Sequence, residues 1–267
     1  MEFHNQMIGI FDSGLGGLAV WRELDLRLPD TDLLYLADNG AFPYGPRPPQ
    51  FLKDRTEKIA RALIARGAGL IVVACNTATV VAIAHLRERF DIPFVGVEPP
   101  VKVAAELAAP DEPIYVLLTE NTASGEKYAA LVEKFGAGRK VKAVCLALLA
   151  RVVEDGSFRE PAVAREVART VREAVGDISE GAKVVLGCTH YVFLRELLQE
   201  ALGPKATILE PSRAVAEQVL RLMTENGMPQ EEAGKREFLC TGDPVTLSLN
   251  AARLLDAKKL EVERVDL

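Results

Sequence analysis

The chain has 267 residues, which is enough for one large domain or two smaller ones with proper apolar cores. Hydrophobic residues make up 49% of it and charged residues 26%, the composition of an ordinary globular enzyme. A net charge of −6 without a basic stripe argues against a nucleic-acid-binding protein, and no apolar run is long enough to cross a membrane. The first expected strand comes almost at once, with no signal peptide before it, which predicts a cytoplasmic location.

Apolar runs typical of strands alternate with segments of helical periodicity along most of the chain. This alternation predicts an α/β fold with mainly parallel sheets. The expected strands are Met7–Phe11, Leu33–Ala37, Leu70–Ala74, Phe94–Val97, Ile114–Leu118, Val141–Cys145, Lys183–Gly187 and Thr207–Leu209, with Leu260–Val265 as a final edge strand. The expected helices are Gly17–Arg27, Phe51–Arg66, Thr77–Phe90, Thr122–Phe135, Glu160–Val175, Tyr191–Ala201, Ser212–Thr224 and Pro244–Leu255.

The longest irregular segment, Asp38–Gln50, is rich in proline and follows the second expected strand. A loop of this kind at the carboxyl end of a strand, inside a compact α/β domain, is more often functional than disordered. We therefore expect this segment to take part in the site.

Two cysteines follow expected strands in nearly the same sequence context. Cys75 stands in Ala-Cys-Asn-Thr and Cys188 in Gly-Cys-Thr-His, and each is followed at similar spacing by a Glu-Pro pair. The repeat predicts two pseudo-symmetric α/β domains with the active site in the cleft between them. The first domain would comprise residues 1–98 with 211–267, and the second residues 99–210.

Each of the two thiols is expected where a helix begins. Backbone N–H groups and the positive end of a helix stabilise a thiolate at such a position. Asn76, Thr77 and Thr189 are capping residue types whose polar groups can also hold an anion. Two thiols at equivalent positions of a repeat favour chemistry over inert packing, and they suit a reaction that needs the same group on both sides of one carbon.

Three further residues could poise these thiols. His190 lies two residues after Cys188 and could orient or protonate it, although a capping or core histidine is the alternative. Asp12 and Glu154 are carboxylates that could act as supporting bases, and a solvated surface position is the alternative for Glu154.

Other interpretations of these motifs fit the sequence less well. Gly14, Gly16 and Ala19 fit a dinucleotide-binding pattern, with Asp38 in the place of a ribose-binding acid, but Asp12 would repel a pyrophosphate there. A Cys-Cys-His metal site lacks a fourth ligand, and the absence of a CxxC pair argues against disulfides and a zinc cluster. Cys145 and Cys240 are interpreted as small buried hydrophobic residues or incidental thiols.

The motifs together resemble those of the glutamate racemases, in the aspartate/glutamate racemase superfamily of cofactor-independent enzymes. The resemblance covers nearly the whole chain, in the order and approximate spacing of the family. The segments that carry it are Asp12–Gly17 (DSGLGG), Pro43–Gly45 (PYG), Ala74–Ala78 (ACNTA), Val153–Gly156 (VEDG) and Gly187–Tyr191 (GCTHY).

The resemblance implies interconversion of L- and D-glutamate without cofactor or metal, with Cys75 and Cys188 as the acid/base pair. It also implies a homodimer that binds a small-molecule substrate, needs neither nucleic acid nor membrane, and supplies D-glutamate for peptidoglycan. The catalytic residues would be Cys75, Cys188, Asp12, Glu154 and His190; the amino acid would be bound by Asp12, Ser13, Tyr44, Gly45, Asn76, Thr77, Thr119, Thr122, Thr189 and His190. The alternatives are an aspartate racemase or another member of the superfamily, or a binding or regulatory protein that has lost turnover.

Overall fold

The computed structural model of the protein describes residues 7–136, 138–178, 180–228 and 234–267. The described chain forms two compact units, the first from Met1–Val97 with Ser212–Leu267 and the second from Glu98–Pro211. The division into domains 1–98 with 211–267 and 99–210 stays a prediction. Residues 1–6 and 229–233 of the first predicted domain, and 137 and 179 of the second, lie outside the described residues.

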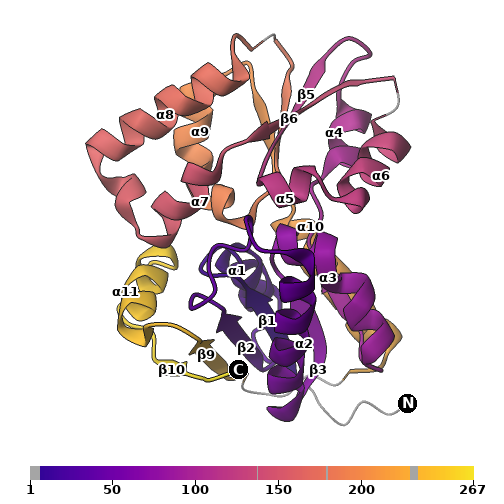
Figure 1. Cartoon of the computed structure of the whole chain (residues 1–267), viewed down its shortest axis with the longest axis vertical. Helices are drawn as coiled ribbons and strands as arrows, with labels where there is room; N and C mark the ends of the chain where they lie inside the picture. The colour runs from indigo at the N-terminus through magenta and orange to yellow at the C-terminus, as the bar shows by residue number, and fades with distance from the viewer. Residues whose placement is uncertain (1–6, 137, 179, 229–233) are drawn as a thin grey trace. The chain divides into compact units, whose positions relative to one another are not determined.

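The first unit is built on a parallel sheet with the strand order β10-β9-β2-β1-β3-β4 (Figure 1). Its central strands are buried along their whole length, as continuous apolar runs in a sheet covered on both faces should be. The strands are β1 (Met7–Asp12), β2 (Leu33–Ala37), β3 (Ala68–Val73), β4 (Phe94–Gly96), β9 (Arg236–Cys240) and β10 (Val262–Arg264).

Helices α2 (Pro49–Ala65) and α3 (Asn76–Arg89) lie side by side and share a core with the sheet. Helices α1 (Leu18–Arg27) and α10 (Ser212–Glu225) pack on each other, and α11 (Pro244–Leu254) contacts β9 and β10. Helix α10 thus belongs to the first unit although the whole second unit precedes it in the chain.

The second unit contains a parallel sheet with the strand order β6-β5-β7-β8. Its strands are β5 (Pro113–Leu118), β6 (Lys140–Cys145), β7 (Lys183–Leu186) and β8 (Thr207–Leu209). Helices α4 (Val101–Leu107) and α6 (Glu126–Phe135) pack on one face, whereas α8 (Pro161–Val175) and α9 (Arg195–Leu202) pack together on the other (Figure 1). The short elements α5 (Glu120–Ala123), α7 (Ala147–Glu154), η1 (Ser157–Arg159) and η2 (Thr189–Leu194) connect them.

The two sheets repeat one topology. The order β2-β1-β3-β4 in the first unit corresponds strand for strand to β6-β5-β7-β8 in the second. In each sheet the chain proceeds from the first strand to one side and then crosses over to the other. Such a reversal creates a switch point, where ligands bind in open α/β sheets. The predicted α/β fold with parallel sheets is confirmed.

Several elements differ from the sequence prediction. The expected helix Thr122–Phe135 is interrupted, because α5 ends at Ala123 and Gly125 caps a new helix, α6. The expected helix Tyr191–Ala201 begins as the 3₁₀ helix η2 and becomes α-helical only at Arg195. Strand β9 and helices α4 and α7 were not predicted. Strand β10 lies at the edge of its sheet, as expected.

Among the described residues, no helix is both long enough and apolar enough to span a bilayer.

Gly17 shows how tightly the first strand-to-helix turn is packed. A Cβ atom at this position would lie 2.8 Å from Cβ of Asp12 and 3.0 Å from Cβ of Ala74. We therefore expect Gly17→Ala to lower the free energy of unfolding by about 1–3 kcal/mol, the usual cost of overpacking. Urea denaturation measures this loss, and an unchanged midpoint and slope would show that the turn has room that the structure does not indicate.

Candidate active site

In the first unit, the predicted site residues gather where β1 and β3 end side by side. Strand β1 ends at Asp12, and β3 leads through Ala74 into Cys75, which is extended and precedes the first turn of α3. The Cys75 thiol donates to Oγ of Ser13, with the two atoms 3.9 Å apart. This pair therefore lies at the carboxyl edge of the sheet, at the switch point between β1 and β3.

Cys75 occupies the N-cap position of a helix of 14 residues, and no side-chain hydrogen bond caps that helix end. The backbone N–H groups of the first turn therefore face the region of the thiol. They supply positive potential there, which favours a thiolate or another anion. The expectation that Cys75 lies at a helix start is confirmed.

Asp12 is fully buried beside this thiol motif. One of its carboxylate oxygens accepts a hydrogen bond from the Gly14 backbone N–H at 3.2 Å, and the hydroxyl of Tyr35 donates to the Gly14 carbonyl at 2.7 Å. These bonds hold the loop that follows β1 in a fixed conformation. The sequence did not reveal Tyr35, because its partner lies 21 residues away.

The side-chain amide of Asn76 offers an oxygen that can accept a hydrogen bond from a ligand. Its Nδ2 donates to the Val97 carbonyl at 3.3 Å, which identifies the other amide atom as Oδ1. Within the described part of the chain, this buried Oδ1 has no hydrogen-bond partner. An unsatisfied buried acceptor is costly, so it is well suited to receive an N–H donor from a ligand. Thr77 beside it is also buried.

The hydroxyl of Tyr44 is buried and donates a hydrogen bond to Oδ2 of Asp38, with the two oxygens 2.6 Å apart. Burial, together with the Asp38 carboxylate, raises the pKa of Tyr44 well above its ordinary value, so the phenol remains a neutral donor. Gly45 next to it is half-buried.

The dinucleotide interpretation of this region does not fit the structure. Asp38, in the place of the ribose-binding acid, is fully buried and accepts four hydrogen bonds, from Tyr44, Thr241 and twice from Arg55. A carboxylate offers about four acceptor positions, so none is left for a ribose hydroxyl.

In the second unit, Cys188 follows β7 and faces His190. The Cys188 sulfur lies 3.9 Å from Nδ1 of His190, and Nε2 of the same ring lies 2.9 Å from a carboxylate oxygen of Glu154. Cys188 and His190 are both buried, and the Glu154 side chain is only 16% exposed. Glu154 is thus a paired residue rather than a solvated one.

This arrangement fixes how the imidazole can act. An ionised carboxylate only accepts hydrogen bonds, so a neutral His190 beside Glu154 carries its proton on Nε2. Nδ1 is then the acceptor that faces the thiol of Cys188. The geometry is that of a thiol, a base and a residue that orients the base, which is the general arrangement of an activated nucleophile or acid/base group.

The second thiol nevertheless differs from the first. Cys188 precedes the six-residue 3₁₀ helix η2 and not an α-helix. Cys188 therefore does not precede an α-helix whose macrodipole could act on it, and its polar support comes from His190.

The remaining predicted residues of the second unit lie at the same sheet edge. The hydroxyls of Thr119, which follows β5, and Thr122 are 3.0 Å apart, and Thr189 is buried. The sequence did not indicate Tyr191, whose hydroxyl donates to the carbonyls of Leu146 at 2.7 Å and Leu118 at 3.3 Å. It joins the ends of β5 and β6 to the turn that follows β7.

All four cysteines are free thiols. Cys240 is buried as expected, but Cys145 is exposed, because it ends the edge strand β6. Of the two interpretations given for Cys145, burial as a small hydrophobic residue is therefore wrong, and an incidental thiol agrees with its exposure. In the ranges that the structure describes, no group of three or more His, Cys, Asp or Glu side chains could hold a metal ion.

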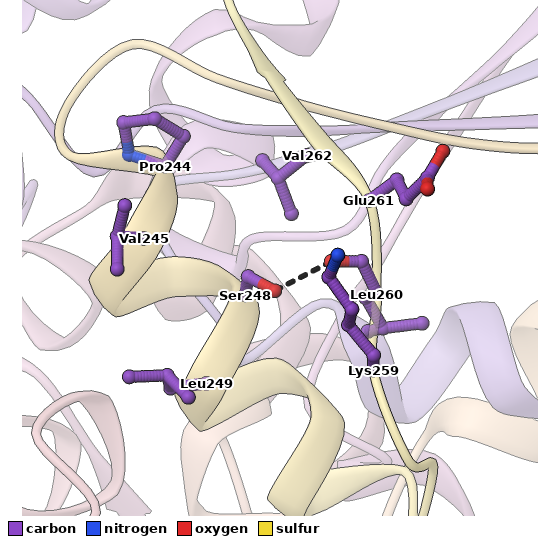
Figure 2. A pocket seen from close by; sticks show the side chains of 8 residues that line it. All are labelled: Pro244, Val245, Ser248, Leu249, Lys259, Leu260, Glu261 and Val262. Atoms are coloured by element: carbon purple, nitrogen blue, oxygen red, sulfur yellow. Dashed lines mark hydrogen bonds between the residues drawn. The ribbon is translucent and has the colours of Figure 1, made fainter.

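A separate pocket of about 560 Å³ lies in the first unit between α11 and the segment that leads into β10 (Figure 2). Its lining is mostly apolar, and the hydroxyl of Ser248 donates to the Leu260 carbonyl across it. The lining residues are Pro244, Val245, Ser248, Leu249, Lys259, Leu260, Glu261 and Val262. None of them is a predicted site residue.

The structure thus groups the predicted residues by unit, each group at the carboxyl edge of one sheet. The first unit holds Asp12, Ser13, Tyr44, Gly45, Cys75, Asn76 and Thr77, and the second holds Thr119, Thr122, Glu154, Cys188, Thr189 and His190. Two parallel sheets of one topology, each with a buried thiol at its switch point, are an arrangement typical of an α/β enzyme.

Comparison with known proteins agrees with this class. Residues 24–219 match the family Asp/Glu/Hydantoin racemase. A glutamate racemase from Herpetosiphon aurantiacus is 39% identical over 243 residues, covering 90% of this chain and 94% of its own. The chain therefore belongs to the Asp/Glu/Hydantoin racemase family and is an amino-acid racemase, an isomerase.

Two solved structures resemble it over nearly their whole length. A glutamate racemase isoform from Bacillus anthracis superposes with a TM-score of 0.87 at 30% identity, covering 99% of this chain and 98% of its own. The Escherichia coli glutamate racemase, in complex with L-glutamate and the activator UDP-MurNAc-ala, superposes with a TM-score of 0.83 at 30% identity and 97% coverage of both chains. The predicted resemblance to glutamate racemases is confirmed.

The contact between His190 and Glu154 can be tested against a matched pair elsewhere. We expect Glu154→Gln to lower kcat for racemisation by at least about tenfold, because an amide no longer fixes the proton of His190 on Nε2. The control is the pair formed by His85 on α3 and Glu57 on α2, in which Nε2 and a carboxylate oxygen are also 2.9 Å apart. The variant His85→Asn should leave kcat unchanged. Equal kcat values for Glu154→Gln and the wild type would exclude the role of Glu154.

Proposed function

We propose that this racemase interconverts L- and D-glutamate by proton transfer at Cα between two cysteine thiols, Cys75 and Cys188. The observation that carries the proposal is that both thiols are buried and occupy equivalent positions, one after β3 and one after β7, in two sheets of the same order. Glutamate as the substrate is supported by the names of the curated relatives and by the L-glutamate in the E. coli structure.

Racemisation requires groups on two faces of one carbon. A proton leaves one face of Cα, a planar carbanion forms, and a proton arrives on the opposite face. Two fixed groups achieve this without turning the substrate over, because one thiolate removes the proton while the opposite thiol donates its own. In this scheme Cys75 deprotonates D-glutamate and Cys188 deprotonates L-glutamate.

The two thiols would be poised by different groups. Cys188 would pass its proton toward Nδ1 of His190, which Glu154 orients. Cys75 would instead be supported by the first turn of α3, the hydroxyl of Ser13 and the nearby Asp12. The two thiols would thus be supported by different groups, a helix end and a hydroxyl for Cys75 and an imidazole for Cys188.

Substrate binding would rest mainly on buried neutral groups. The Oδ1 of Asn76 is a suitable acceptor for the substrate ammonium, since it lacks a partner within the described chain. The remaining contacts would come from Asp12, Ser13, Tyr44, Gly45, Thr77, Thr119, Thr122, Thr189 and His190. Donors aimed at the α-carboxylate would stabilise the charge that develops in the transition state, in a site from which water is excluded.

The proposal includes no cofactor and no metal, because thiols and backbone donors suffice for the proton transfer. The D-glutamate formed would serve peptidoglycan synthesis, and with it cell shape, in the cytoplasm. We further propose that the protein acts as a homodimer.

We expect the purified protein to interconvert L- and D-glutamate with no pyridoxal phosphate, nucleotide or metal added, and to act far more slowly on L-aspartate. Chiral chromatography of both enantiomers measures this directly. Dependence on added pyridoxal phosphate, or loss of activity in EDTA, would exclude the cofactor-independent mechanism. Faster turnover of aspartate would identify an aspartate racemase instead.

We expect Cys75→Ser and Cys188→Ser each to lower kcat/KM by about 10²-fold or more, because a hydroxyl is a much poorer base than a thiol. The two enantiomers of glutamate have equal free energies in water. Each variant must therefore lose kcat/KM equally in both directions, whichever thiol it lacks.

Cys145→Ser and Cys240→Ser are the matched controls, one exposed and one buried, and should keep kcat/KM within about twofold of the wild type. Circular dichroism polarimetry from each enantiomer supplies the four rates. A control that loses activity while a site variant keeps it would show that the site has been assigned to the wrong thiols.

A further inference from the structure

A single buried carboxylate holds together the part of the first unit that carries Tyr44 and Gly45. Asp38 directly follows β2 and is fully buried. Its Oδ2 accepts from the Tyr44 hydroxyl at 2.6 Å and from Nε of Arg55 at 2.9 Å. Its Oδ1 accepts from Nη2 of Arg55 and from the Thr241 hydroxyl, both at 2.6 Å.

These donors come from three different parts of the chain, one of which is 203 residues away from Asp38. Tyr44 belongs to the proline-rich loop, Arg55 to α2, and Thr241 to the turn between β9 and α11. The backbone of Asp38 adds a fourth connection, because its N–H donates to the carbonyl of Asp12 at 2.8 Å. Asp38 thus links the end of β1, which carries predicted catalytic residues, to the loop that carries predicted binding residues.

The turn after β9 supports the same loop by its backbone. The Gly40 N–H donates to the Thr241 hydroxyl at 3.0 Å, and the Gly242 N–H donates to Oδ1 of Asn39 at 2.7 Å. A Cβ at Gly40 would lie only 2.9 Å from the Thr241 carbonyl oxygen, so the two segments are in direct contact. The loop is therefore fixed at its start, Asp38–Gly40, and again at Tyr44.

The network also settles what Tyr44 can offer to a ligand. Its hydroxyl is committed to Asp38, and its ring is buried in the apolar core that includes Cys75. A phenol that is already bonded to a buried carboxylate would not be released to solvent or substrate without leaving that charge undersatisfied. The part of Tyr44 and Gly45 that remains for a substrate is the backbone.

We propose that Asp38 is a positioning residue, which holds the Tyr44–Gly45 backbone in its substrate-binding conformation through the Tyr44 hydroxyl, Arg55 and Thr241. This inference rests on the proposed function, since it assigns to the loop a contact with glutamate. Displacement of the loop weakens binding in the ground state and the transition state alike. Its loss should therefore raise KM while kcat at saturation is kept.

Asp38→Asn is the direct variant, but it places an amide among four donors and could prevent folding. The Tyr44→Phe and Thr241→Val variants each remove one hydroxyl and keep the size of the side chain, and Thr241→Ser restores a hydroxyl. Tyr115→Phe is the matched control, because Tyr115 is a buried tyrosine in the middle of β5, in the second unit.

For Tyr44→Phe we expect KM for both glutamate enantiomers to rise about tenfold, and for Thr241→Val about threefold, with kcat within about twofold of the wild type. Thr241→Ser should return KM to the wild-type value, and Tyr115→Phe should not change it. A purely structural role would instead lower the melting temperature and the active fraction, and so kcat, with KM unchanged. That result, or unchanged KM in both hydroxyl variants, would overturn the proposal.

Hydrogen exchange of the amides of residues 39–48 separates this inference from the proposed function. Faster exchange in Tyr44→Phe and Thr241→Val than in Tyr115→Phe supports the anchoring role, and equal exchange overturns it. A wild-type protein that does not turn over glutamate would refute the proposed function alone, because the exchange measurement needs no substrate.

Discussion

The parallel pairing of β1 with β2 on one side and β3 on the other is the constraint on which the first unit depends. Parallel strands end at the same edge of a sheet, so Asp12, Asp38 and Cys75 are brought together although 63 positions separate the first from the last. The pairing of β5 with β6 and β7 does the same for Thr119, Leu146 and Cys188 in the second unit. The positions of both thiols follow from where these strands end, because each thiol is the N-cap residue of the helix that comes after a buried strand.

Cys75 and Cys188 occupy equivalent positions in the two sheets, but their surroundings differ. Cys75 precedes a long α-helix and contacts a hydroxyl, whereas Cys188 precedes a short 3₁₀ helix and contacts an imidazole that is itself paired with Glu154. A helix end acts through fixed partial charges, but an imidazole can also take up a proton. The two cysteines therefore have different polar neighbours, although the sequence motifs around them are nearly the same.

Local sequence was sufficient for most of the elements and for both thiol motifs, because buried parallel strands read as continuous apolar runs and the helices that follow have clear periodicity. Local sequence was not sufficient where contacts with distant parts of the chain determine the structure. Strand β9 is only five residues long and starts with Arg236 and Glu237, so its extended conformation depends on its pairing with β2 and β10. The partners of Asp38 were equally hidden, since Thr241 lies 203 residues away from it.

The route of the chain has a consequence for the order of folding. All strands of the second unit are contiguous in sequence, so its sheet can be complete once residue 209 has been synthesised. The sheet of the first unit cannot be completed at that stage, because β2 lacks its outer neighbour until β9 has been synthesised. Pairing of β2 with β9 also closes a long loop of chain, and the entropic cost of this closure slows folding. During that interval β2 is an exposed apolar edge, the kind of surface that recruits chaperones or promotes misassembly on the ribosome. Strand β9, which is synthesised after the whole second unit, is thus the segment that covers this edge of β2.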